Sequence, residues 1–354
     1  MNRYRIPFVS FIVLMMLTVS ACSSSSTGSE PSPEGKGSSG ETFEFKLGHM
    51  NSPDHVQDDV KTAWAEEVAA ATENRVIFDI YPGGALGGPK ETYDNVVTGI
   101  MDAGWGIQGY NAGKFPVHSV LHLPFMTDGN AAELSVVAQK LYETFPEIQA
   151  EYSEVKPLWF HAVDPYMIIT KGKAVRSFED VKGLKLRTPS VEGSGMIESW
   201  GATPVSLPAP EMYDALQKGV IDGGVLPISA IADFNLFDVV DYVTLGNFNT
   251  NLYYTVMNKG SWDKLPADDQ ATIEGLVGLQ MAQKAGEAYD GQKAAAEAKA
   301  KEMGVEFIEL PDEEVQKYKD ASQVVAEKWI ADMEAKGIPG QAIYDEAVKL
   351  ISEN

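Results

Sequence analysis

The chain has 354 residues, 51 of them acidic and 28 basic, so its formal net charge at pH 7 is −23. This charge excludes nucleic acids and anionic membrane surfaces as partners, because both repel an acidic protein. The hydrophobic share of 44%, with a length beyond what one core usually serves, predicts a folded protein of two domains.

The amino terminus has the three regions of a secretory signal peptide. Two arginines precede an apolar run from Phe8 to Val19, and small residues follow. We therefore expect residues 1–21 to be removed and the protein to be exported. Cys22, the only cysteine, resembles the lipobox cysteine of bacterial lipoproteins, which receives a lipid. An ordinary cleaved signal with an unmodified thiol is the alternative.

Residues 22–42 are expected to form a lipidated cysteine and a flexible tether, since serine, glycine and proline dominate this stretch. The expected location is the extracytoplasmic face of the cell membrane, in the periplasm or outside a Gram-positive cell. A lipid at Cys22 would be the only contact with the membrane, because no later segment has the length of a transmembrane helix.

The remaining sequence alternates strand and helix patterns. Alternating apolar residues near residue 43 predict a strand, and a helix with one buried face follows from residue 56. A β-branched and aromatic run at 75–81 predicts a second strand. Such alternation is typical of α/β proteins with mainly parallel sheets flanked by helices.

Two segments repeat one another. Residues 91–105 (ETYDNVVTGIMDAGW) align with residues 211–225 (EMYDALQKGVIDGGV). Each reads as a helix that ends at glycine and leads into a strand, so we expect two similar lobes with a cleft between them. Chance similarity of helix-glycine-strand units is the alternative.

A helical pattern rich in alanine, glutamate and lysine extends from about residue 265 to Met303. A helix of that length is long enough to run across both lobes. The expected boundaries are 43–164 plus about 253–290 for lobe I. Lobe II would comprise 165–252 plus about 291–354, including the carboxy-terminal helices.

Arg187 lies near the end of a short strand, LKLRTP, that Pro189 terminates. Ligands of open α/β sheets bind outside the carboxyl ends of strands, and arginine there offers a planar fork for a carboxylate. The residues alone leave two interpretations open: an anion-binding arginine in a cleft, or a surface arginine paired with a nearby acid.

Motifs for catalysis are largely missing. Residues 104–109 (GWGIQG) match the dinucleotide-binding fingerprint, but no helix pattern follows them. His118 and His122 are four residues apart in a segment that reads as extended, and they are interpreted as structural histidines. We expect no metal, no cofactor and no enzyme activity. A secreted enzyme on a similar scaffold is the alternative.

Three segments carry a family resemblance: FEDVKGLKLRTP from residue 178, WGATPVSLPAPEMYDALQKGVIDGGVLP from residue 200 and YYTVMNKGSWDKLP from residue 253. They resemble the DctP-type solute-binding proteins of TRAP transporters, over most of residues 43–354. The resemblance implies a two-lobed periplasmic-binding-protein fold of type II, with a long helix bracing both lobes. The GLKLRTP and YDALQKGVIDG segments favour this family over ABC-type binding proteins with the same two-lobed architecture.

In that family the arginine of the GLKxR strand clamps the ligand carboxylate, which implies this role for Arg187. Many members have a second arginine on the preceding strand, where this chain has Tyr166 or Met167, and an asparagine where it has Leu226. The full set of expected ligand-binding residues is Arg187, Tyr166, Asn51, Trp105, Ile107, Tyr110, Phe125, Leu207 and Leu226.

The loss of polar anchors predicts a monocarboxylate ligand with an apolar or aromatic body. A dicarboxylate or a sugar acid is the alternative within the family. The expected partners are this small organic acid and the small and large membrane subunits of a TRAP transporter. We expect the receptor itself to be a monomer.

Overall fold

The computed structural model describes residues 41–127 and 129–353, and Glu41–Asn354 form one compact unit. The predicted signal peptide, Cys22 and nearly all of the predicted tether lie outside the described residues. None of the described helices is both long and apolar enough to cross a membrane.

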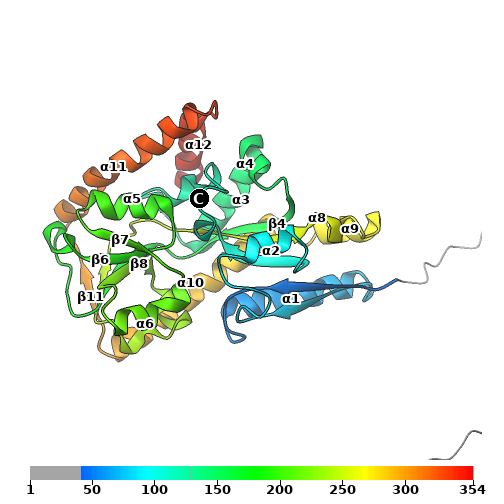
Figure 1. Ribbon diagram of the computed structural model, residues 1–354, viewed down its shortest axis with the longest axis horizontal. Coiled ribbons are helices and arrows are strands. Elements are labelled where there is room, and N and C mark those ends of the chain that lie inside the picture. The colour runs from blue at the N-terminus through cyan, green and yellow to red at the C-terminus, as the bar shows by residue number, and fades with distance from the viewer. Residues whose placement is uncertain (1–40, 128, 354) are drawn as a thin grey trace, which may run out of the picture. The chain divides into compact units, whose positions relative to one another are not determined.

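The first lobe is built on a five-stranded sheet with the order β2-β1-β3-β10-β4. Its strands are β1 (Phe43–Gly48), β2 (Val76–Tyr81), β3 (Ala103–Ile107), β4 (Val155–Ala162) and β10 (Leu252–Asn258). Its helices are α1 (Val56–Ala71), α2 (Thr92–Val97), α3 (Ala131–Thr144) and α4 (Pro146–Glu151). Helix α1 packs against β2, α2 against β3 and α3 against β4 (Figure 1).

The second lobe is built on a six-stranded sheet with the order β11-β9-β5-β8-β6-β7. Its strands are β5 (Tyr166–Thr170), β6 (Lys185–Thr188), β7 (Thr203–Ser206), β8 (Gly223–Pro227), β9 (Tyr242–Leu245) and β11 (Glu306–Glu309). Its helices are α5 (Val191–Ser199), α6 (Met212–Gln217) and α7 (Ser229–Asp233). Short 3-10 turns η1 (Gln108–Tyr110), η2 (His118–His122), η3 (Phe178–Val181), η4 (Ala209–Glu211) and η5 (Leu236–Asp238) join the elements.

Both sheets are mixed. Strand β10 runs antiparallel to β3 and β4, and β5 runs antiparallel to β8 and β9. The chain crosses from the first sheet to the second after β4 and returns to the first sheet after β9. The first strand after each of these crossings, β5 or β10, is the one that runs antiparallel to both of its neighbours. The two-lobed α/β architecture is thus confirmed, but antiparallel pairs at the crossings replace the expected mainly parallel arrangement of the first sheet.

The internal repeat is visible in the hydrogen bonds of the two lobes. The carboxylate of Asp102 accepts from the backbone N–H of Lys46 at 3.0 Å, and that of Asp222 accepts from the N–H of Lys185 at 2.8 Å. In turn, the N–H groups of Asp102 and Asp222 donate to the carbonyls of Lys46 and Lys185 at 3.0 and 2.9 Å. Each aspartate therefore joins a helix-to-strand turn to the neighbouring strand in the same way.

The long helical segment is interrupted, so the prediction of one continuous helix was wrong. It consists of α9 (Ala267–Glu274) and the 24-residue α10 (Leu279–Glu302), and the short α8 (Lys259–Trp262) precedes it. Gly278 breaks it at φ 70°, a left-handed conformation that suits glycine. At about 1.5 Å per residue, α10 is about 36 Å long. It packs on α3 and β4 of the first lobe and on α7 of the second (Figure 1).

Two further helices close the chain, α11 (Asp312–Glu334) and α12 (Gly340–Ser352). Helix α11 packs on α5 of the second lobe and on α12, which packs on α3 of the first lobe. A continuous apolar cluster also joins the lobes and contains Trp105, Tyr166, Tyr253 and Tyr289. The residues between the two sheets are thus held by both lobes and by α10.

Candidate ligand-binding site

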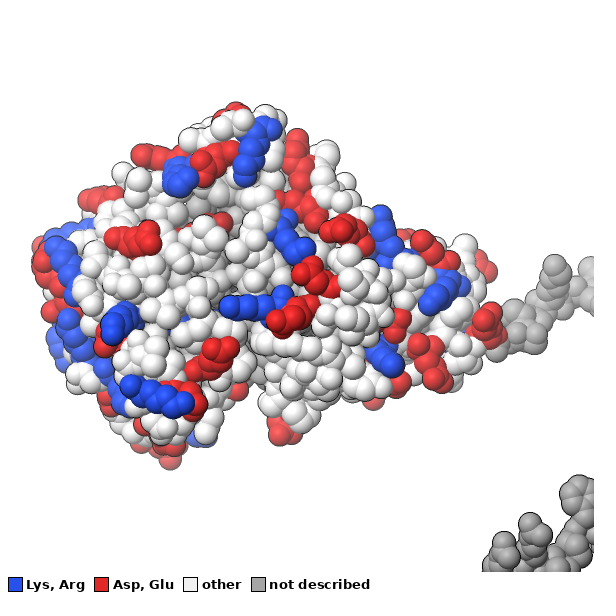
Figure 2. All heavy atoms as spheres, in the orientation of Figure 1, with Lys and Arg blue, Asp and Glu red and all other residues white. Residues whose placement is uncertain are grey.

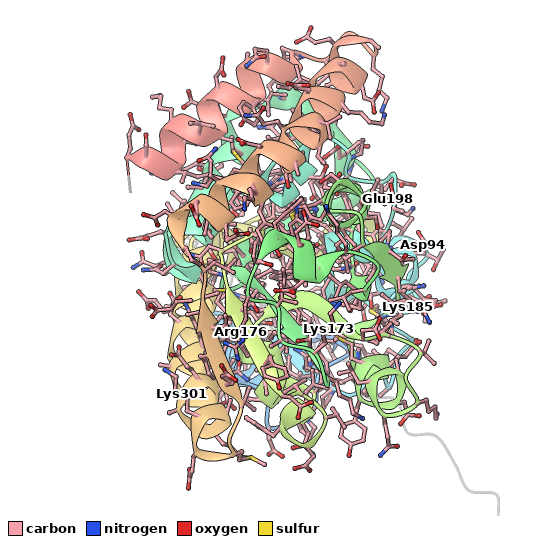
Figure 3. All side chains as sticks on the ribbon, turned by 90° about the vertical axis from the view of Figure 1, so that its left-hand side faces the viewer. Asp94, Lys173, Arg176, Lys185, Glu198 and Lys301 are labelled. Carbon is pink, nitrogen blue, oxygen red and sulfur yellow. The ribbon has the colours of Figure 1, made fainter. Side chains whose placement is uncertain are left out.

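Arg187 is buried at the carboxyl end of β6, with 2% of its surface exposed. The next element, α5, begins at once because the side chain of Ser190 caps its amino terminus by accepting from the N–H of Gly193. Other charged residues of this lobe, among them Lys185 on the same strand, point outward into solvent (Figure 3). The surface-arginine interpretation of Arg187 was therefore wrong.

The guanidinium of Arg187 is held by two hydrogen bonds. Its Nε donates to the carbonyl of Leu207 at 2.9 Å, and its Nη2 donates to the hydroxyl of Tyr110 at 3.1 Å. Among the described residues, no carboxylate lies within 4.0 Å of it, and no further hydrogen bond of the guanidinium is formed. Arg187 is thus a buried cation whose remaining N–H donors are available to an anion.

Tyr110 reaches Arg187 from the first lobe. It follows Gly109, at which an added Cβ would lie 3.1 Å from the carbonyl of Pro189 on the second lobe, so a side chain there would keep the lobes apart. The Tyr110 oxygen accepts from Arg187 and from the N–H of Ala209 at 2.7 Å. Burial raises the pKa of this phenol. Both its partners are pure donors, so the phenolic hydrogen is left to donate to a third group.

An enclosed cavity lies beside Arg187 between the two lobes. Its empty volume is about 320 Å³. The lining combines aromatic and apolar side chains with a few polar groups, as small-molecule sites do. It consists of Met50, Asn51, Ile107, Tyr166, Arg187, Ala209, Pro227, Ala230, Asp233, Phe234, Tyr253 and Tyr289.

One wall of the cavity is made of tyrosines from three elements. Tyr253 on β10 packs in one cluster with Tyr166 on β5 and Tyr289 on α10, with 5.8 Å between the ring centroids of Tyr253 and Tyr289. Burial raises the pKa of all three phenols, so they remain protonated at neutral pH. Behind them, the Trp105 ring stacks on Tyr253 with 4.8 Å between ring centroids. This wall of the cavity is therefore aromatic.

The family model of bacterial extracellular solute-binding proteins, family 7 (DctP), matches residues 47–333. The chain belongs to this family. It is a TRAP-type solute-binding protein, and a TRAP solute-binding protein from Rhodoferax ferrireducens in complex with copurified benzoate is similar to it. The two are 30% identical with a TM-score of 0.84, covering 88% of this chain and 98% of that one.

Two other TRAP solute-binding proteins differ in their ligands. A marine metagenome protein specific for aromatic acid ligands, in complex with 3-hydroxybenzoate, is 29% identical with a TM-score of 0.83, covering 88% of this chain and 98% of that one. The protein from Roseobacter denitrificans with bound β-D-glucuronate is 20% identical with a TM-score of 0.75, covering 87% and 98%. The latter likeness concerns the fold alone.

Within this DctP-family fold, the structure brings most of the predicted site residues together. Asn51, Ile107, Tyr166 and Arg187 line the cavity. Tyr110 and Leu207 do not line it but hold the guanidinium of Arg187.

Three predicted residues lie elsewhere. Trp105 is behind Tyr253, and its indole N–H donates to His161 Nε2 at 2.8 Å. Phe125 packs on Phe248, with 6.0 Å between ring centroids. Leu226 belongs to the core of the second lobe, because side chains alternate along β8 and it is Pro227 that faces the cavity.

Sequence reasoning missed several cavity residues, notably Asp233, Phe234, Tyr253 and Tyr289. Tyr253 falls within a segment that carries the family resemblance, YYTVMN, but nothing there distinguishes its side chain from that of Tyr254. Asp233 and Tyr289 lie on helices whose sequence patterns do not indicate which face meets the cleft.

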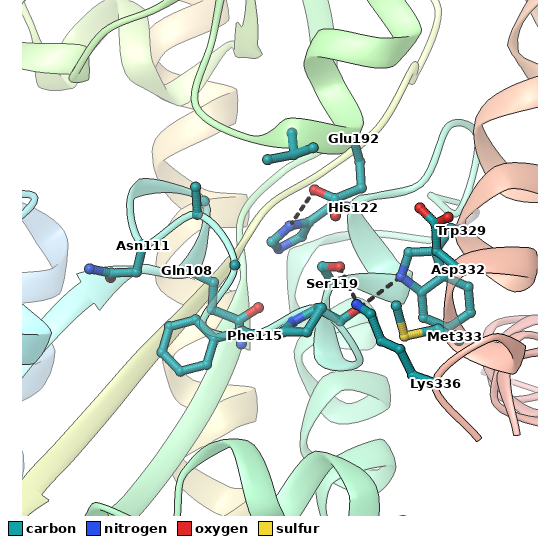
Figure 4. A pocket seen from close by; sticks show the side chains of 15 residues that line it. Gln108, Asn111, Phe115, Ser119, His122, Glu192, Trp329, Asp332, Met333 and Lys336 are labelled. Atoms are coloured by element: carbon teal, nitrogen blue, oxygen red, sulfur yellow. Dashed lines mark hydrogen bonds and ion pairs between the residues drawn. The ribbon is translucent and has the colours of Figure 1, made fainter. Parts of the chain in front are cut away.

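A second recess opens near the carboxy-terminal helices, between η2, α5 and α11 (Figure 4). Its empty volume is about 630 Å³. His122 Nδ1 and Glu192 Oε2 lie 3.6 Å apart there, and the indole N–H of Trp329 donates to the carbonyl of Pro116 at 2.8 Å. The other charged side chains of the recess, Asp332 and Lys336, are exposed to solvent, so it lacks the buried cation that marks the cavity beside Arg187.

His118 and His122 have separate structural partners. His118 is fully buried against Tyr152 and the carbonyl of Ala138, and burial lowers its pKa to about 3. His122 Nε2 accepts from the N–H of Leu252 at 3.0 Å. Among the residues that the structure describes, no three His, Cys, Asp or Glu side chains form a group suited to a metal ion.

Proposed function

We propose that this protein is the extracytoplasmic receptor of a TRAP-type secondary transporter and that it binds a monocarboxylate with an aromatic or other apolar body. Arg187 clamps the carboxylate, and the lobes close on the rest of the ligand. The observation that carries the proposal is the buried guanidinium with no acidic partner among the described residues. A buried charge of this kind demands a counterion.

The shape of the cavity favours an aromatic acid over a sugar acid. Its walls are largely aromatic and apolar, and Pro227 and Ile107 face it where a sugar would need hydrogen-bonding partners. The relatives with aromatic acids are 29–30% identical to this chain, whereas the glucuronate-binding relative is 20% identical. Sugar acids and dicarboxylates are the competing ligand classes, and the titration described below includes one acid of each.

The delivery of this ligand requires the small and large membrane subunits of the transporter, and the receptor acts as a monomer held at the membrane by a lipid on Cys22. Mass spectrometry of the amino-terminal peptide from cell membranes should find the lipid on Cys22. A soluble protein with an unmodified thiol would contradict this part of the proposal.

Isothermal titration of the purified protein with benzoate, mandelate, succinate and glucuronate tests the ligand class. We expect benzoate or mandelate to bind at least about tenfold more tightly than the other two acids, because the cavity offers one cation and little polar surface. Tight binding of succinate or glucuronate alone would contradict the proposed class.

The clamp is tested by Arg187→Lys, with Arg176→Lys as the matched control, since Arg176 is exposed and pairs with Glu306 on the surface. Lysine cannot reproduce two parallel hydrogen bonds to a carboxylate, so Arg187→Lys should weaken binding by about a hundredfold. Equal affinities of the two variants would remove Arg187 from the site.

A further inference from the structure

Asp233 lines the same cavity as Arg187 and is the only carboxylate among its lining residues. It lies at the end of α7, and only 5% of its side chain is exposed. A carboxylate that shares a cavity with the proposed carboxylate clamp repels a second acid group. It is suited instead to accept a hydrogen bond from a ligand.

The neighbours of Asp233 use only one of its two oxygens. The N–H of Gln57 donates to His55 Nδ1 at 3.0 Å, so the ring hydrogen of His55 sits on Nε2, which lies 3.0 Å from Asp233 Oδ1. The side-chain amide of Gln292 also donates to Oδ1. No described residue donates to Oδ2, which leaves this oxygen for another partner.

Asn51 supplies a second acceptor without a donor. The residue is 3% exposed and lines the cavity, and its Oδ1 is buried with no hydrogen-bond partner among the described residues. Its Nδ2 lies 3.1 to 3.2 Å from the ring nitrogens of His55. A buried acceptor without a partner is costly, which favours a ligand that donates to it.

The tyrosines of the wall do not fill this need. Among the described residues, no hydrogen bond joins the hydroxyl of Tyr166, Tyr253 or Tyr289 to Asp233 or Asn51. All three tyrosines line the cavity together with Arg187, Asp233 and Asn51. The cavity therefore offers donors near Arg187 and acceptors at Asp233 and Asn51.

We propose that Asp233 and Asn51 form a second subsite that binds a hydroxyl group of the ligand, so that the preferred ligand is a hydroxylated aromatic monocarboxylate. This inference rests on the proposed function and names its ligand more closely. A hydroxyl donates one hydrogen, which Asp233 Oδ2 or Asn51 Oδ1 accepts. An ammonium group carries three hydrogens and needs three acceptors, more than these two residues leave open.

The test compares benzoate with 3-hydroxybenzoate and 4-hydroxybenzoate by isothermal titration of the purified protein. We expect one of the two isomers to bind about tenfold more tightly than benzoate, because a buried hydrogen bond to a charged group is gained. In Asp233→Asn and Asn51→Ala this preference for the hydroxylated acid over benzoate should fall to about threefold or less.

Asp238→Asn is the matched control, since Asp238 is an exposed aspartate five residues further along the chain. It should keep the full preference for the hydroxylated acid. Two variants of different residues guard against a local folding defect, which would lower the affinity for all three acids together.

The outcomes separate this inference from the function on which it rests. If benzoate binds and Arg187→Lys abolishes its binding, but neither isomer is preferred or the preference survives in both variants, only the hydroxyl subsite is overturned. If 3-(aminomethyl)benzoate binds more tightly than both hydroxybenzoates and loses this advantage in Asp233→Asn, the subsite binds an ammonium group and the hydroxyl assignment is wrong.

Discussion

A guanidinium buried as deeply as that of Arg187 has given up its hydration and must find other partners. The carbonyl of Leu207 and the hydroxyl of Tyr110 fix its plane but supply no negative charge. A ligand carboxylate would complete this arrangement without reorganising it. Because Tyr110 already accepts two hydrogen bonds, its own hydrogen can add to the donors that Arg187 presents.

Lys61 is a second deeply buried cation, but its surroundings lead to a different conclusion. It is 0% exposed on α1; its Nζ donates to the carbonyl of Gln57 at 2.6 Å and lies 4.3 Å from the ring centroid of Trp105. Burial lowers its pKa well below the usual value, and the charge of Asp58 only partly offsets this effect. Lys61 does not line the cavity, so its burial reduces stability with no evident gain in binding.

We therefore predict that Lys61→Met stabilises the protein at pH 7, by about 1–2 kcal/mol in the free energy of unfolding. At pH values between the lowered pKa of Lys61 and about 10.5, the unfolded chain binds more protons at residue 61 than the folded protein does. The stability of the unmodified protein should thus rise with pH in this window, and the advantage of Lys61→Met should shrink. Urea unfolding at several pH values measures both trends.

Lys46→Met, at an exposed position on β1, is the control and should show no such pH-dependent gain. A less stable Lys61→Met at pH 7, or a difference that stays constant up to pH 10, would show that burial of Lys61 carries no such cost.

The connection from β4 to β5 contains Asp164, one of the most buried acids of the protein. Its carboxylate accepts from the hydroxyl of Ser229 at 2.5 Å and from the N–H of Ser229 at 3.3 Å, which ties the crossing to α7. Burial raises its pKa from 3.8 to about 7, although the hydrogen bonds from Ser229 oppose this rise. The folded state therefore holds a proton at Asp164 that the unfolded chain releases.

Because the folded state binds more protons here, stability should fall as the pH rises from about 4 to about 7, by on the order of a few kcal/mol. Asp164→Asn removes the charge and should flatten this part of the stability profile in urea unfolding. Asp263→Asn changes an exposed aspartate and should keep the slope. A slope that persists in Asp164→Asn would assign the pH dependence to other groups.

The sequence predicts elements well where their pattern is local. The repeat of residues 91–105 and 211–225 indicated two matched units, and the bonds of Asp102 and Asp222 show the match. The break of the long helix at Gly278 was missed because alanine-rich and charged residues on both sides favour a helix. The antiparallel strands were missed because period-two patterns do not specify strand direction.

The site was predictable only in part, for a related reason. Arg187 is marked by the strand that ends beside it, and the family resemblance assigns it a role. Asp233 and Tyr289 lie 56 residues apart on two different helices and meet Asn51 only through tertiary packing. Leu226 and Pro227 are neighbours in sequence, but alternation along β8 sends only one of them to the cavity.

At the scale of the whole molecule, an acidic protein must admit an anion. Acidic and basic side chains are interspersed over the face shown in Figure 2, and the chain has 51 acids against 28 bases. The overall field therefore gives an anionic ligand no general attraction. The attraction must come from inside the cleft, which makes the affinity depend on how well the closed lobes exclude water around Arg187.

Contacts between the lobes determine that closure. Tyr110 of the first lobe holds Arg187 and Ala209 of the second. At the other opening, His122 of the first lobe lies 3.6 Å from Glu192 on α5 of the second. Burial tends to raise the pKa of Glu192, but the polar groups around its carboxylate, including those of His122 and Ser119, outweigh this effect and the pKa is lowered. The charged form of Glu192 is thus favoured in the closed arrangement.

We predict that Glu192→Gln releases benzoate about fivefold faster at pH 7, because it weakens the electrostatic attraction between the Glu192 carboxylate and the ring of His122, which exists only when the lobes meet. Stopped-flow tryptophan fluorescence measures the release rate, since Trp105 stacks directly behind the cavity wall. Glu198→Gln on the exposed side of the same helix is the control and should not change the release rate.

The pH dependence of release gives a second test. The charged form of Glu192 helps to hold the lobes together above the ordinary pKa of 4.5, and this contribution is lost as the pH falls through the lowered pKa of Glu192. The two proteins should therefore release benzoate at more similar rates in acid. Equal rates at pH 7 would show that this contact does not hold the lobes together.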